Sequence, residues 1–167
     1  MLDHAYRRLA AAAGTTKLAI HTAYGSLGDA FPAMTALPVH AIGLDLVHGR
    51  ENLALIEQHG FPSGKTIVAG VVDGRNIWVN DLEASLTVLE KLAERVGNDH
   101  VQVSSSSTLL HTPYDVRLET DLKPEIVPWL AFAEQKLAEI VLLTRGLNGG
   151  REAIAAALAE RAEVLAA

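Results

Sequence analysis

The chain has 167 residues, a length typical of one domain, and its 49% apolar and 20% charged residues predict a packed globular protein rather than a disordered one. Its 14 Lys and Arg against 20 Asp and Glu give a net charge of -6, so we expect neither a nucleic-acid nor a membrane partner, because both bind to cationic surfaces. The absence of cysteine excludes disulfides and any thiolate zinc site within the chain.

Four short apolar runs predict four β-strands. They are Lys17–Thr22, His40–Val47, Thr66–Val72 and His100–Ser104. The second and third runs show little polar alternation, which is typical of parallel strands that are covered on both faces.

The segments between these strands carry apolar residues at the spacing that is typical of helices. Gly28–Ala36 is a weak candidate, and Glu51–His59 is a better one that ends at Gly60. Residues 82–93 carry leucines three or four positions apart, and Asp81 is placed to cap the backbone amides at the start of that helix.

The last third of the chain predicts two more helices. The first is a long helix over Glu125–Leu143 with Pro124 in its first turn, and the second is an alanine-rich helical tail over Arg151–Ala167. The residues of the long helix that we expect to face the protein core are Ile126, Leu130, Ala133, Leu137 and Ile140. We assign the two tryptophans, Trp78 and Trp129, to core packing, which is the usual role of aromatic side chains.

The alternation of strands and helices predicts an α/β fold of four βα units with parallel strands and right-handed crossovers. A complete TIM (β/α)8 barrel takes about 250 residues, so this chain is long enough for half of one or for a small open sheet. We assign residues 1–147 to the half-barrel domain and residues 148–167 to the C-terminal helical tail.

No apolar run approaches the roughly 18 residues needed to span a bilayer. Residues 1–14 carry charges before a run of only five apolar residues, which is too short for the core of a secretory signal. We therefore expect a cytoplasmic protein.

Polar residues gather where the predicted strands end, which is where parallel α/β folds bind ligands. The candidate residues for this strand-end crevice are His21, Asp45, Asp73, Arg75, Asn76, Ser107 and His111. Two interpretations of Asp45 stay open, a ligand-binding carboxylate or a buried carboxylate paired with an arginine. We expect Asp45 and Arg75 to share the crevice, with one neutralising the other or a neighbour. No serine-hydrolase elbow or glycine-rich phosphate loop is present, so we assign no catalytic residue.

Several strings in the chain are specific enough to indicate a family. They are HAIGLDLVHG at 40–49, VVDGRNIW at 71–78, SSTLLHTP at 106–113 and WLAFAEQKLAE at 129–139. With them the chain resembles, from about Lys17 to about Leu147, the N-terminal domain of the cobalamin-independent methionine synthase family.

The resemblance implies a two-barrel methyltransferase of methionine biosynthesis, which moves a methyl group from 5-methyltetrahydrofolate-oligoglutamate to homocysteine on a zinc ion. This chain would be the second half of the first barrel. The zinc, homocysteine and most of the folate site belong to the other barrel of the family, so we expect no cofactor or metal site here and no catalysis by the chain alone. Folate and homocysteine would be ligands of the complete enzyme only.

The two barrels of the family resemble each other, which invites a comparison with the zinc ligands of the catalytic barrel. The corresponding positions here are His21, Ala23, Asp45 and Ser107, so that alanine and serine stand where sulfur ligands would be. Zinc affinity depends on the number and softness of the ligands, so this vestigial set is expected to hold no stoichiometric zinc.

Two other functions remain open from the residues alone. One is a stand-alone scaffold or binding module that holds a small anion through Arg75, Asn76 and His111. The other is a small metal-dependent enzyme that uses His21, Asp45 and His111.

Four parallel strands cannot close a barrel, because about eight are needed. We therefore expect the Val, Ile and Leu side chains of the second and third strands to be left without the other half of their core. The partner that covers them is expected to be a second copy of the chain or the remaining part of the synthase. The N-terminal segment or the tail helix is the alternative cover.

Overall fold

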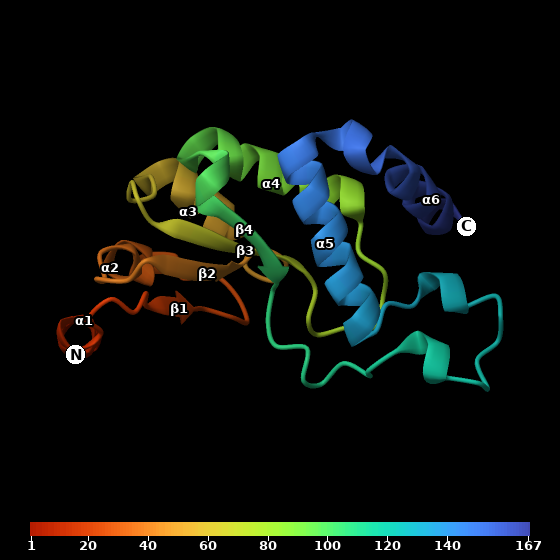
Figure 1. Ribbon diagram of the computed structural model, residues 1–167, viewed down its shortest axis with the longest axis horizontal. Helices are drawn as coiled ribbons and strands as arrows, with labels where there is room; N and C mark the ends of the chain where they lie inside the picture. The colour runs from red at the N-terminus through yellow and green to blue at the C-terminus, as the bar shows by residue number, and fades with distance from the viewer.

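The computed structural model describes all residues from Met1 to Ala167, and its central feature is one four-stranded parallel sheet (Figure 1). The strands are β1 (Ala19–His21), β2 (Ala41–Asp45), β3 (Thr66–Val72) and β4 (Val101–Ser105). They are hydrogen-bonded in the order β1-β2-β3-β4, so that β1 and β4 form the two edges. Each strand overlaps one of the four predicted runs.

Six α-helices accompany the sheet, with short 3-10 turns between some of them. They are α1 (Leu2–Ala12), α2 (Phe31–Thr35), α3 (Glu51–His59), α4 (Leu82–Val96), α5 (Ala133–Gly149) and α6 (Ala155–Ala166). This alternation of parallel strands and helices confirms the predicted α/β class and matches half of a TIM-like barrel. No helix combines the length and apolarity needed to cross a bilayer.

One face of the sheet carries the main core. Ile20, Ile42, Ile67 and Val101 are paired in register across the four strands, and all four belong to or pack against the main hydrophobic cluster. The leucines of α4 cover this face, which explains their spacing of three or four residues. Burying one such side chain completely contributes about 1.5–3 kcal/mol to stability.

The opposite face, which we call the open face, carries the intervening residues of the strands. Its central row is His21, Gly43, Val68 and Gln102, again paired in register. His21 and Gln102 are exposed, and the His21 ring lies so close to Gly43 that a Cβ there would come within 2.3 Å of its Cδ2 atom. The open face is therefore built from small and polar side chains.

This arrangement corrects the expectation that apolar side chains of the second and third strands lack a cover. Ile42, Leu44 and Ile67 are fully buried, because the alternation of side chains along a strand directs them toward the helices. Val68, which is half-buried, is the large apolar residue that β3 leaves on the open face.

The long helix predicted over Glu125–Leu143 is wrong in its start and in its phase. The helix begins at Ala133, after a segment over residues 106–132 that is mostly irregular. Leu130 of that segment forms an antiparallel bridge with Trp78, and the Ala131 amide donates to the Ile77 carbonyl at 2.7 Å. Pairing with the distant loop after β3 satisfies these backbone groups, so they do not join the helix.

The buried stripe of α5 consists of Lys136, Glu139, Leu143 and Gly146 rather than the predicted one. Leu137, a member of the predicted stripe, is 50% exposed. The helix also extends past the predicted end at Leu143 to Gly149, and it stops where Gly150 adopts a φ of 79° that favours glycine. The assignment of Trp78 and Trp129 to the core is also wrong, since they are 52% and 41% exposed.

The remaining helix signals are confirmed. The Asp81 carboxylate accepts the Ala84 amide at 2.9 Å and caps α4, and Gly60 ends α3. The tail docks through Arg151, whose guanidinium pairs with Glu83 and Glu90 on α4. These contacts fix α6 relative to the rest of the fold.

The phase of α5 can be tested with two leucines of the same helix. We expect Leu143→Ala, at a fully buried position, to lower the free energy of unfolding by about 2–5 kcal/mol. The control Leu137→Ala is expected to change it by about 0.5 kcal/mol or less. Chemical denaturation measures both, and a larger loss for Leu137→Ala would contradict the observed phase.

Candidate functional site

Asp45 lies at the end of β2 and is fully buried. Its carboxylate accepts backbone amides from Gly25 at 3.1 Å, Val47 at 3.0 Å and His48 at 2.9 Å. No ion pair joins Asp45 to Arg75, so of the two interpretations of Asp45 the pairing with an arginine is wrong. Three backbone donors already stabilise the buried carboxylate, so it needs no cation.

Asn52, in the first turn of α3, completes this clamp. It is fully buried, its Nδ2 donates to the carbonyl of Asp45 at 2.8 Å and of Gly25 at 3.2 Å, and its Oδ1 accepts the Leu27 amide at 2.9 Å. Gly49 allows the close approach, since a Cβ there would lie 2.4 Å from the Gly25 carbonyl oxygen. The sequence analysis missed Asn52, although its place in the first turn of a predicted helix beside a glycine was a usable signal.

Asp73 connects the loops after β2 and β3. Its Oδ1 accepts the Arg75 amide at 2.7 Å and lies 3.2 Å from His48 Nε2, while its Oδ2 accepts Asn76 Nδ2 at 2.7 Å. Two of the candidate residues, Asp73 and Asn76, are therefore in contact, and His48 lies beside Asp73. Their contacts form a turn and leave little hydrogen-bonding capacity for a ligand.

Two charged side chains of α5 lie buried behind this turn. Lys136 Nζ donates to Asn76 Oδ1 at 3.1 Å and to the Trp78 carbonyl at 3.0 Å, and burial lowers the pKa of this lysine. Glu139 accepts the Asn80 amide at 2.8 Å and pairs with Arg161 of α6 at 3.0 Å, and burial raises the pKa of its carboxyl. The shifted start of α5 hid both residues from the sequence analysis.

Arg75 points to the loop after β1. Its guanidinium carbon lies 5.5 Å from the centre of the Tyr24 ring, which is a cation–π contact. Tyr24 is 59% exposed and has a φ of 69°, the only positive φ outside glycine. Because Asn76 is committed to Asp73 and Lys136, the structure gives the proposed anion site of Arg75, Asn76 and His111 no support.

Ser107 and His111 follow β4. Ser107 is buried against Gly74, where a Cβ would come within 2.7 Å of its Oγ, so no ligand fits between them. His111 is exposed in a turn that Thr112 fixes by donating to the Gly74 carbonyl at 3.3 Å. No group of three or more His, Cys, Asp or Glu side chains is placed to hold a metal ion, so the structure does not bring His21, Asp45 and His111 together as a metal site.

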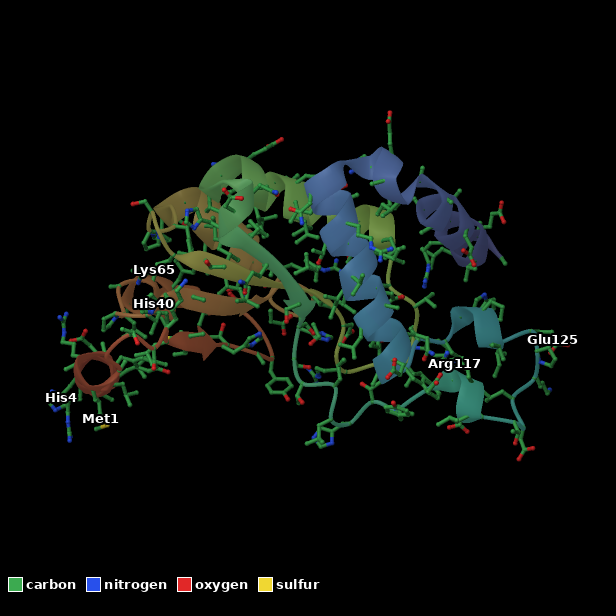
Figure 2. The ribbon with its side chains drawn as sticks, viewed as in Figure 1. Met1, His4, His40, Lys65, Arg117 and Glu125 are labelled. Atoms are coloured by element: carbon green, nitrogen blue, oxygen red, sulfur yellow. The ribbon has the colours of Figure 1, made fainter.

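The segment over residues 106–132 is anchored to α5 through Asp115. Its carboxylate pairs with Arg117, which is labelled in Figure 2, at 2.7 Å and accepts Gln135 Nε2 at 2.8 Å. The hydrogen bonds from Arg117 hold the pKa of the Asp115 carboxyl well below its usual range. His40 and Lys65 lie at the other end of the sheet, where Lys65 donates to the carbonyls of α2 and of the turn after it (Figure 2).

A pocket of about 460 Å³ lies between the first turns of α3 and α4 on the helical side of the sheet. Leu46, Leu53, Val71 and Val88 line it, with Asn80 and Asp81 at its polar end. None of the seven candidate residues contributes to it. At the strand ends, Asp45 and Asp73 are therefore occupied by amides of the neighbouring loops, and the seven candidate residues do not place a nucleophile beside a base.

The clamp around Asp45 predicts unequal effects of two substitutions. Asp45→Ala leaves the amides of Gly25, Val47 and His48, which donate in part-buried hydrogen bonds, without this acceptor, so we expect a loss of about 3 kcal/mol in the free energy of unfolding. Arg75→Ala removes an exposed cation–π contact and is expected to cost about 1 kcal/mol or less. Thermal or chemical unfolding measures both, and equal losses would restore the ion-pair interpretation.

Comparison with known proteins matches residues 1–97 to the family described as cobalamin-independent synthase, N-terminal domain. A 5-methyltetrahydropteroyltriglutamate–homocysteine methyltransferase of Streptomyces avermitilis is 47% identical over 158 residues, which are 94% of this chain and 20% of the relative. A protein of the same description from Oryza sativa subsp. japonica, numbered 1, is 45% identical over 89% of the chain. Another protein of this description, from Kali turgidum, is 50% identical over 80% of the chain. The chain spans about a fifth of the length of these curated relatives.

Proposed function

The chain belongs to the cobalamin-independent methionine synthase family, in which it matches the N-terminal domain, and from this premise we propose that it supplies part of that domain to a methionine-forming methyltransferase. The main support for this proposal is the 47% identity with the Streptomyces avermitilis methyltransferase over 94% of the chain. The relatives are described as methyltransferases that act on 5-methyltetrahydropteroyltriglutamate and homocysteine, and we extend both substrates to the complete enzyme only.

The role of this part is structural rather than chemical. Asp45, Asp73 and Asn76 are occupied in building the loops at the strand ends, where an active site of this fold class would lie. The buried pairs of Lys136 and Glu139 join α5 to the same loops. Such a rigid strand-end surface supports chemistry that other parts of the enzyme carry out.

Zinc does not fit the residues present. His21 is exposed on the open face, Asp45 is saturated by backbone amides, and Ser107 is packed against Gly74. We therefore propose that zinc, folate and homocysteine bind elsewhere in the complete enzyme. Because the relatives are described as homocysteine methyltransferases, we propose the cytoplasm as the location of this chain.

A chimera tests this role. In the Streptomyces avermitilis relative, the segment aligned with this chain is replaced by the chain itself, and methionine formation from homocysteine is measured. We expect an active chimera with unchanged zinc content, whereas the isolated chain forms no methionine and carries no stoichiometric zinc. A folded, zinc-loaded chimera without activity, or methionine formation by the isolated chain, would contradict the proposal.

A further inference from the structure

The pocket between the first turns of α3 and α4 is built from the middle of the chain. All of its lining residues lie between Leu46 and Val88, and the two helices follow the central strands of the sheet, β2 and β3. A strand added beside β1 or β4 would extend the sheet at its edges and leave both walls of the pocket in place. The pocket therefore belongs to these two βα units.

The two helices are joined at one end and leave space at the other. Near their C-terminal ends, Glu57 of α3 and Arg95 of α4 form an ion pair at 3.6 Å. In its first turn α4 contributes the small side chains of Ala84 and Ser85 to the pocket, and α3 contributes Leu53. The resulting volume of about 460 Å³ lies within the range of roughly 300–1,000 Å³ that is typical of small-molecule sites.

Most of the pocket wall is aliphatic. Leu46 and Val71, at the ends of β2 and β3, are buried, while Leu53 and Val88 of the two helices are half-buried. A ligand that covers these four side chains removes apolar surface from water, which favours binding. The pocket therefore suits a ligand with an aliphatic chain.

Two opposite charges line the same pocket without pairing with each other. Arg50, the residue before α3, is exposed, and its guanidinium forms no hydrogen bond or ion pair within the chain. Asp81 accepts the Ala84 amide through Oδ1, which leaves its Oδ2 free. The other polar lining side chains, Asn80 and Ser85, are joined by a hydrogen bond of 2.8 Å. A cation and a carboxylate oxygen thus remain available to a ligand.

We propose that this pocket binds a free α-amino acid with an unbranched apolar side chain. The ligand carboxylate pairs with Arg50, its ammonium group pairs with Asp81, and its side chain lies on Leu53 and Val88. A guanidinium binds a carboxylate through charge-assisted hydrogen bonds. The aliphatic wall disfavours a polar side chain, because it offers no hydrogen-bond partner to replace water. An internal residue of a peptide is excluded as well, since it carries neither terminal charge.

This binding is separate from the proposed role in a methyltransferase. The pocket shares no residue with the clamp around Asp45 or the turn around Asp73. Binding is measured directly, without methionine formation as a readout. An inactive chimera would therefore leave this proposal standing, and a failure to bind would leave the methyltransferase role standing.

Calorimetric titration with three matched ligands tests the chemistry of the site. Norleucine carries both charges, hexanoate lacks the ammonium group, and pentylamine lacks the carboxylate, while all three carry an unbranched aliphatic chain. We expect saturable one-to-one binding of norleucine and at least about tenfold weaker binding of the other two, because each loses a charge-assisted hydrogen bond. No saturable binding of norleucine, or equally tight binding of hexanoate or pentylamine, would overturn the proposal.

Charge variants test the two residues separately. Asn caps a helix about as well as Asp, so Asp81→Asn removes the charge and keeps the cap of α4. We expect Arg50→Gln and Asp81→Asn each to weaken norleucine binding at least about tenfold. The control is Arg145→Gln, at another exposed arginine that lies on α5 outside the pocket, and it should leave the affinity unchanged. Unchanged affinity in either pocket variant, or an equal loss in the control, would contradict the assignment.

A pocket-filling variant tests the location. Ala84 is exposed on α4 and lines the pocket, so Ala84→Phe should occupy the space and abolish norleucine binding while the chain stays folded. Ala162→Phe, at an exposed alanine of α6, is the matched control and should bind norleucine like the wild type. Circular dichroism confirms that both variants are folded. Undiminished binding by folded Ala84→Phe would place the ligand elsewhere and overturn the proposal.

Discussion

The packing of helices on one face of the parallel sheet holds the fold together. Parallel pairing of Ile20, Ile42, Ile67 and Val101 places one apolar row under the helices, and a second row with Leu44 and Ala69 follows it. Because side chains alternate along each strand, the same pairing sends small and polar residues to the open face. One-sided burial thus explains how four strands fold without the rest of a barrel.

Buried polar groups at the strand ends serve the same architecture. Asp45 and Asn52 hold the loop after β1, and Asp73 joins the loops after β2 and β3. Lys136 then extends these contacts to α5. A satisfied network in a low-dielectric interior fixes a single conformation, which suits a part that positions the chemistry of a larger enzyme.

The spacing of apolar residues and the capping residues predicted those elements that depend mainly on neighbours in the sequence. The strands, α4 and its Asp81 cap follow from periodicity and capping chemistry, whereas the start of α5 depends on a bridge between Trp78 and Leu130, far apart in the chain. The crevice residues were placed near the strand ends by the same logic. Their partners were not predictable, because Asp45 selects backbone amides that only the folded loops bring together.

Strand-resolved amide hydrogen exchange distinguishes a sheet that is covered by packed helices from a loosely packed one. The amides of β2 and β3 have hydrogen-bonded neighbours on both sides, so we expect them to exchange more slowly than those of the mostly irregular segment over residues 106–132. Exchange in β2 and β3 as fast as in that segment would show that the helix-covered core does not form as described.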